Sequence, residues 1–160
     1  MKQIVELDYK GLKVKGIRIS VKTELPAHMD KIWHKIQDVE TLRYITKPKL
    51  YFFPLEDLPP QWNNGDTYVF KTWMHGFIPI GKHSIQVMDI NKEKREIYTN
   101  ENNVTVKIWN HFIKIRKITE EKTYYEDTVD IYAGFLTRFI AWWSIKFYQH
   151  RQKKWLNLLK

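Results

Sequence analysis

Two polar residues lie within apolar segments and are the best candidates for acid–base chemistry. His111 falls in one predicted strand and Asp127 in the next. A histidine beside a carboxylate is a common proton-transfer pair in enzymes. Because side chains alternate between the faces of a strand, each residue shares its face with apolar neighbours: Trp109, Ile113 and Ile115 in the first strand, and Tyr125, Val129 and Ile131 in the second.

Strand register decides whether this pair can meet. A hairpin centred near Glu121 pairs Ile113 with Val129 and Ile115 with Asp127, which matches the apolar faces. In that register His111 and Asp127 are four residues apart along the sheet, about 13 Å, too far for a hydrogen bond. The sequence therefore favours two structural roles: His111 bonded to a backbone carbonyl, and Asp127 paired with the first helix or a cavity arginine. The alternative open for His111 is to orient a polar ligand head.

Other reactive sites find no support in the sequence. The six histidines show no H-x-H, H-x3-H or HExxH spacing, and the chain has no cysteine, so we predict no metal site. Phosphate-binding P-loops, GxGxxG loops and GxSxG nucleophile elbows are also missing, and we predict no cofactor. Trp62 and Trp73 lack a basic cluster around them, which argues against nucleic-acid binding.

Length and composition indicate a packed globular protein. The 160 residues, 15% of them aromatic, predict a single domain over residues 1–160. The N-terminal segment lacks the apolar run of a signal peptide, so we expect a cytoplasmic location. The segment Ile131–Tyr148 is the only candidate membrane span, but it carries Arg138 and Lys146 and is better explained as a buried helix.

The net charge of +9 is concentrated at the C-terminal end, where six lysines and arginines follow Asp130 without any acid. A solvated basic helix end explains this excess, because cations suit the C-terminus of a helix. Weak contact with an anionic membrane surface, through these charges and Trp155, is the alternative.

The order of predicted elements is typical of an α+β fold. Residues 1–15 form an extra strand or a loose leader, and 16–24 a half-buried strand. Two short helices follow over 27–37 and 39–45, and Pro48 ends the second. Strands are predicted at 49–53, 67–74, 83–90, 96–100, 104–118 and 123–132, with a long loop over 55–66 and an apolar reversal over 76–81.

The long C-terminal helix, predicted from Gly134 to Leu159, would organise the fold. Its apolar residues form two neighbouring stripes at helical spacing. One stripe consists of Leu136, Ile140, Trp143 and Phe147, and the other of Phe135, Phe139 and Trp142. Such a helix needs a broad apolar surface, which the strands upstream would supply.

Several motifs resemble the START-like, or SRPBCC, superfamily of lipid-transfer domains and polyketide cyclases. They are Leu25–Ala27 after the first strand, Trp109–His111 as a W-x-H strand, Tyr125–Val129 before the last helix, and the ending Phe147–Trp155. The chain has Asn102 and Asn103 where the small bacterial ligand-binding branch often has Gly-Pro before the W-x-H strand. None of these motifs is a catalytic signature.

The resemblance implies a helix-grip fold, in which a curved antiparallel sheet of about six to seven strands wraps the long helix around an apolar cavity. Binding or transport of a small hydrophobic ligand is the function it implies, with the loop 55–66 and the reversal 76–81 at the entrance. The alternatives are a cyclase- or dehydratase-like enzyme using His111 or a cavity tyrosine, and a membrane-surface lipid carrier. The expected ligand-binding residues are Phe70, Met74 or else Trp73, Trp109, His111, Ile113, Asp127, Val129, Phe139, Trp142 and Trp143.

Overall fold

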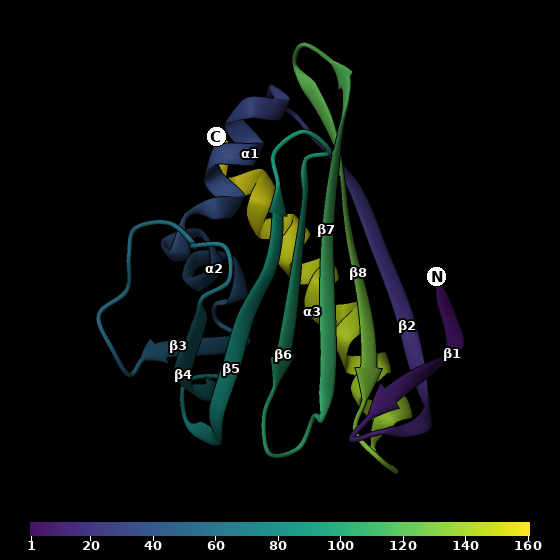
Figure 1. Ribbon diagram of the computed structural model, residues 1–160. Coiled ribbons are helices and arrows are strands. Elements are labelled where there is room, and N and C mark those ends of the chain that lie inside the picture. The colour runs from purple at the N-terminus through teal and green to yellow at the C-terminus, as the bar shows by residue number, and fades with distance from the viewer.

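The computed structural model describes residues 1–160 as one curved sheet with a long helix across its concave side (Figure 1). Eight strands and three helices follow one another along the chain in the order expected from the sequence: strands, two short helices, further strands and a long helix. They are β1 (Lys2–Tyr9), β2 (Leu12–Leu25), α1 (Met29–Gln37), α2 (Val39–Thr46), β3 (Leu50–Pro54), β4 (Thr67–Met74), β5 (Ile78–Asn91), β6 (Glu96–Asn102), β7 (Ile108–Thr119), β8 (Lys122–Tyr132) and α3 (Thr137–Leu158).

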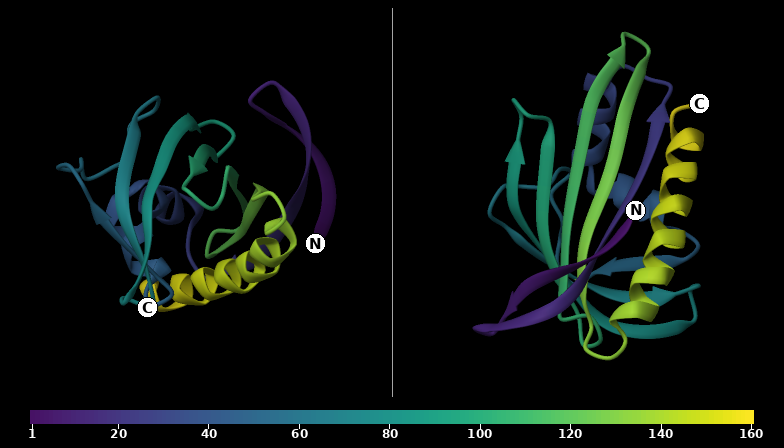
Figure 2. Two further views of the ribbon diagram at one scale, coloured as in Figure 1. Left: turned by 90° about the horizontal axis from the view of Figure 1, so that it is seen from below. Right: turned by 90° about the vertical axis from the view of Figure 1, so that its right-hand side faces the viewer.

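The sheet is antiparallel throughout, in the order β1-β2-β8-β7-β6-β5-β4-β3. Seen from below, its strands curve as a cup, and α3 runs across the open side (Figure 2). Register shifts in β4, β5 and β7 mark bulges, which bend a strand and increase its twist. The helices α1 and α2, which connect β2 to β3, close one end of the cup, and α2 packs against α3.

Residues 1–15 take the first of the two forms left open by the sequence, an extra strand. Lys10 and Gly11, both with positive φ, form the tight turn of a β1–β2 hairpin, so that the sheet has eight strands rather than six or seven. The start of the penultimate strand differs from the expectation. Strand β7 begins at Ile108 rather than at Val104. The Asn103 side chain accepts hydrogen bonds from the backbone N–H groups of Thr105 and Val106, which holds residues 103–107 as a loop.

The helix α3 buries a face that includes polar residues. The buried positions are Thr137, Ala141, Ser144, Phe147, Tyr148, Arg151, Gln152 and Trp155. The predicted stripe from Leu136 to Phe147 lies beside this face. The second predicted stripe is wrong as a packing surface: Phe135, Phe139 and Trp142 are 95%, 58% and 52% exposed. A single helix presents only one side to the sheet. Trp142 lies on the other side, Phe139 lies at the edge between the two sides, and Phe135 precedes the helix.

The basic tail is also different from the expectation. Trp155 has no exposed surface and packs against Tyr125 of β8, at 5.6 Å between ring centroids. Arg151 is buried as well, at 6% exposure. Because its tryptophan points into the core, the tail lacks the aromatic anchor that membrane contact was expected to use.

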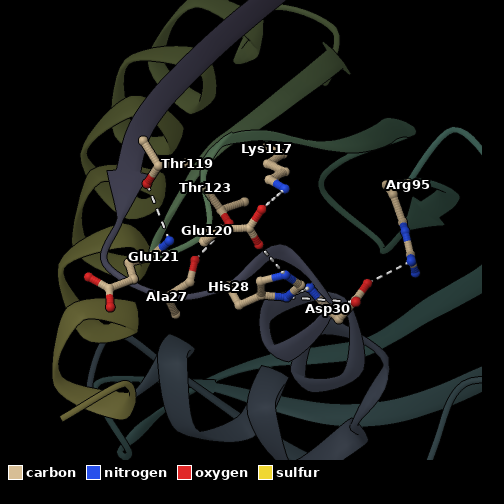
Figure 3. Close-up of polar contacts among 9 residues, drawn as sticks. All are labelled: Ala27, His28, Asp30, Arg95, Lys117, Thr119, Glu120, Glu121 and Thr123. Atoms are coloured by element: carbon tan, nitrogen blue, oxygen red, sulfur yellow. Dashed lines mark hydrogen bonds and ion pairs between the residues drawn. The ribbon is translucent and has the colours of Figure 1, made fainter.

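A polar cluster joins the tip of the β7–β8 hairpin to the start of α1 (Figure 3). The Glu120 carboxylate forms ion pairs with Lys117 and with His28, whose Nε2 lies 3.3 Å away. The Thr123 hydroxyl donates to the carbonyl of Ala27 at 2.8 Å. These contacts place the two-residue turn Glu120–Glu121 against α1 and help to fix the register of the hairpin.

Replacing Trp155 by alanine should lower the free energy of unfolding by about 3–5 kcal/mol, since it removes a fully buried aromatic ring. The matched control Trp142→Ala, at an exposed position of the same helix, should cost less than about 1 kcal/mol. Urea unfolding followed by circular dichroism measures both. Equal losses in the two variants would contradict the burial of Trp155.

Candidate functional site

An apolar cavity of about 270 Å³ lies between the concave face of the sheet and the first half of α3. Its volume is near the lower end of the range for ligand pockets, about 300–1,000 Å³. The predicted stripe of α3 forms one wall with all four of its residues. The cavity is lined by Leu136, Phe139, Ile140, Trp143, Phe147, Tyr148 and Arg151 of α3, and opposite them by Leu50, Phe52, Thr72, Met74, Ile80, His83, Glu101, Trp109 and the loop residues Asn103, Thr105 and Val106, with Leu42 of α2.

A second, smaller cavity of about 50 Å³ lies toward α1 and α2. His111, Ile113 and Tyr125 from the sheet contribute to its lining. Leu42, Glu101 and Arg151 line both cavities, so these three side chains mark the boundary between the two spaces. The larger cavity therefore has apolar walls over most of its surface and a charged inner end.

The expected separation of His111 and Asp127 is wrong. In the structure His111 pairs with Val129, and Ile113 pairs with Asp127, a register two residues away from the expected one. The turn is Glu120–Glu121, and a bulge between Lys117 and Thr119 shifts the pairing further. His111 and Asp127 thus become diagonal neighbours on one face of the sheet, where long side chains can meet. The Nε2 atom of His111 lies 2.8 Å from Oδ1 of Asp127.

Asp127 is the centre of a buried hydrogen-bond network. Its carboxylate is 1% exposed and also accepts hydrogen bonds from the Tyr125 hydroxyl at 3.2 Å and the Gln152 amide at 3.1 Å. Gln152 donates in addition to the backbone carbonyl of Val21. The role of Asp127 is structural in these contacts, with partners on β7, β8 and α3 rather than on the first helix.

Glu101 of β6 connects two histidines. One of its oxygens lies 2.8 Å from Nε2 of His83, and the other lies 3.7 Å from Nδ1 of His111 and accepts a hydrogen bond from the Thr99 hydroxyl. Both ring nitrogens of His111 therefore face carboxylates, as they do when the ring is an imidazolium and both nitrogens donate. No backbone carbonyl bonds His111, in contrast to the sequence prediction.

His83 has a different environment. The Asn103 amide oxygen is held by two backbone N–H groups, so its Nδ2 faces Nδ1 of His83 at 3.2 Å and donates to it. An accepting Nδ1 leaves the proton on Nε2, which donates to Glu101. This hydrogen-bond pattern assigns His83 as the neutral imidazole.

The pKa shifts of the network follow from these contacts. Burial by itself raises the pKa of Glu101, but the bonds from His111 and His83 outweigh it and hold that pKa far below its usual range. Burial lowers the pKa of His111, and the contacts with Asp127 and Glu101 reverse this and raise it overall. Both shifts favour the same ion pair, a Glu101 carboxylate beside a protonated His111.

Arg151 makes no hydrogen bond and no ion pair, although it is buried. Its guanidinium lies over the ring of Tyr148, 4.8 Å from the centroid. Burial lowers the pKa of Arg151, but the neighbouring Tyr148 and Asp127 raise it overall, so the side chain stays charged. The Tyr148 hydroxyl accepts a hydrogen bond from the Trp109 indole at 2.9 Å and donates to no residue. Burial raises the pKa of Tyr148 well above its usual range, so its proton is retained.

The predicted site residues divide into three groups. Those that line the larger cavity are Met74, Trp109, Phe139 and Trp143, and those that line the smaller one are His111 and Ile113. Phe70, Asp127 and Val129 are buried behind the cavity walls. Trp73 and Trp142 line neither cavity. For Trp73 the reason is strand alternation, since Thr72 and Met74 on either side of it line the larger cavity, and for Trp142 it is the outer face of α3.

The sequence interpretation missed the polar inner end of the cavity. Arg151 was assigned to a solvated tail, yet it follows Ser144 and Tyr148 at helical spacing on the buried face of α3. His83 and Glu101 lie on the same strand faces as buried apolar residues of β5 and β6. The same pattern identified His111 in β7 as a candidate site residue. Arg138 and Lys146, the two charges within the segment considered as a membrane span, are exposed.

A larger hollow lies outside the cup, against strands β6, β7 and β8. Most of its lining is polar or charged, including Arg18, Glu96 and Glu126. The enclosed apolar cavity is therefore the better ligand site. No helix is long and apolar enough to cross a membrane, and no group of three or more His, Asp or Glu side chains is arranged to hold a metal ion.

Replacing Glu101 by glutamine should destabilise the protein most between about pH 4.5 and 6.5. Because the pKa of Glu101 is lowered in the folded protein, its contribution to stability is lost as the pH falls below the pKa of this side chain in the unfolded protein. Because the pKa of His111 is raised in the folded protein, its contribution to stability is lost as the pH rises. The free energy of unfolding of the variant should be about 3 kcal/mol lower than that of wild type in this pH window, and the difference should become smaller at lower and at higher pH. Urea unfolding from pH 3 to 9 measures it, and a difference independent of pH would contradict this network.

No protein-family model matches the chain, and no curated protein matches it in sequence. Solved structures do match. A START superfamily protein from Mycobacterium smegmatis superposes with a TM-score of 0.68 at 12% identity, covering 88% of this chain and 94% of its own. Norcoclaurine synthase from Thalictrum flavum, in complex with dopamine and hydroxybenzaldehyde, gives 0.64 at 11% identity, covering 89% and 85%.

The Zhui aromatase/cyclase from Streptomyces sp. R1128 gives a TM-score of 0.60 at 18% identity, with 88% of each chain covered. These similarities span nearly the whole of each chain, at identities that establish the fold alone. Together with the antiparallel sheet and the long C-terminal helix, they show that this protein has the START-like, or SRPBCC, helix-grip fold.

Proposed function

We propose that the protein binds or carries a small, mostly hydrophobic molecule in the cavity between the sheet and α3. The observation that carries this proposal is the cavity itself, about 270 Å³, with walls of aromatic and aliphatic side chains. Burial of a ligand there would gain about 25 cal/mol per Å² of apolar surface. The START superfamily protein of similar fold supports a ligand-binding role in general terms.

The entrance follows from the lining residues. Ile80 of β5, Thr105 of the β6–β7 loop and Leu136 at the start of α3 all contribute to the cavity from the same end of the cup. The predicted reversal 76–81 reaches this end, whereas the loop 55–66 contributes Trp62 to the smaller cavity instead. Exposed Phe139 lies on the rim.

Native mass spectrometry of the purified protein, followed by organic extraction, tests this function. We expect a discrete adduct that is lost in Leu136→Trp, because the larger ring would occupy the mouth of the cavity. The control Leu156→Trp makes the same change at an exposed position of α3 and should keep the adduct. An unliganded mass, with no thermal shift across a panel of lipids and aromatic compounds, would count against a carrier.

A second candidate is an enzyme that uses the same cavity for cyclase- or dehydratase-like chemistry. The specific observation in its favour is Tyr148, whose protonated hydroxyl lines the larger cavity, with His111 next to its ring in the lining of the smaller cavity. An imidazolium or a phenol can donate a proton to a reacting group. Norcoclaurine synthase and the aromatase/cyclase of similar fold support this candidate by analogy only.

Incubation with a panel of cyclisable carbonyl compounds separates the two candidates. For an enzyme, His111→Gln should lower the turnover rate by about 10²–10⁴-fold while the far-ultraviolet circular dichroism spectrum is unchanged. For a carrier, no compound is converted, and the same substitution changes only the stability. Full turnover in folded His111→Gln would rule out a catalytic role for this histidine.

A further inference from the structure

The inner end of the cavity offers hydrogen-bond donors that no protein group uses. The Arg151 guanidinium has five N–H donors, is 6% exposed, and makes no hydrogen bond or ion pair. The Tyr148 hydroxyl accepts from Trp109 and has no acceptor for its own hydrogen. Both side chains line the larger cavity and lie next to each other, with the guanidinium over the tyrosine ring.

An unsatisfied buried donor is costly, and a buried charge without a hydrogen-bond partner is more so. The carboxylates nearby do not supply the missing acceptor, since neither Glu101 nor Asp127 forms an ion pair or a hydrogen bond with Arg151. Their hydrogen bonds come from other donors: Glu101 from His83 and Thr99, and Asp127 from His111, Tyr125 and Gln152. A group that fills this end of the cavity must therefore accept hydrogen bonds.

The charge of the cluster decides which acceptor fits. The contacts indicate two negative groups, the carboxylates of Glu101 and Asp127, and two positive groups, the Arg151 guanidinium and His111, whose two ring nitrogens both face carboxylates. His83 accepts from Asn103 and donates to Glu101, which is the hydrogen-bond pattern of a neutral imidazole. Two negative and two positive charges cancel. A carboxylate on the ligand would add an uncompensated negative charge beside Glu101, in a space with little water. An uncharged carbonyl oxygen brings two lone pairs and no charge.

We propose that the ligand is a carbonyl compound, a ketone or an ester with an apolar body, whose carbonyl oxygen accepts hydrogen bonds from Arg151 and Tyr148. This inference rests on the proposed function and adds the class of ligand. The apolar body would lie along Leu136, Ile140 and Trp143 toward the mouth, and the carbonyl would point to the boundary between the two cavities.

Three ten-carbon probes test the proposal by quenching of intrinsic tryptophan fluorescence at pH 7.5: decan-2-one, decanoic acid and decane. Wild type should bind the ketone at least about tenfold more tightly than the acid. Arg151→Met should weaken ketone binding by about tenfold or more and leave decane binding unchanged, because the variant loses charge-assisted donors and keeps the apolar walls. Tyr148→Phe should weaken ketone binding by a smaller factor.

The control Lys146→Met removes a charge from the exposed face of the same helix and should leave all three affinities unchanged. Tighter binding of the acid than of the ketone, or ketone binding that both Arg151→Met and Tyr148→Phe retain, would overturn the carbonyl assignment. If Arg151→Met does not fold, two other measurements test the carbonyl assignment: the effect of Tyr148→Phe on ketone binding, and the relative affinities of wild type for the ketone and the acid. Failure of wild type to bind decane and decan-2-one would instead reject the cavity function itself.

Discussion

The structure depends on one geometric mismatch, between a wide concave sheet and the single helix that covers it. Seven spacings of about 4.8 Å make eight strands about 34 Å wide, whereas a helix with its side chains is about 10–12 Å across. The helix α3 therefore covers only part of the concave face. The short helices α1 and α2 cover one end of the cup, and the remaining space is the apolar cavity.

The same mismatch explains why polar residues are buried on α3. The inner face of α3 meets the packed core along part of its length and the cavity along the rest. At the positions of Tyr148, Arg151 and Gln152 this face meets the strands that carry Glu101 and Asp127. Burying these groups costs solvation energy, which their pairing offsets for all except Arg151 and the Tyr148 hydroxyl. The unpaired donors are for this reason the most informative feature of the site.

The fold of this protein does not by itself indicate its chemistry. Proteins with 8–18% identity to the chain share its architecture, and they include a synthase and an aromatase/cyclase as well as a START superfamily protein. Similarity at such identities establishes the fold and not the chemistry of the cavity. The function must therefore be argued from this chain's own cavity, in which one end is charged and electrically balanced and the rest is apolar.

The order of elements, the long helix and the apolar stripe from Leu136 to Phe147 could be predicted from the sequence, because helical and strand periodicity are local properties. The inward faces of β7 and β8 could be predicted in the same way. How these elements meet became clear only from the fold. The bulge near Lys117 set the register that joins His111 to Asp127, and the position of α3 in the cup turned Arg151 inward and Trp142 outward. Register and helix rotation depend on contacts between distant segments, and no local pattern contains them.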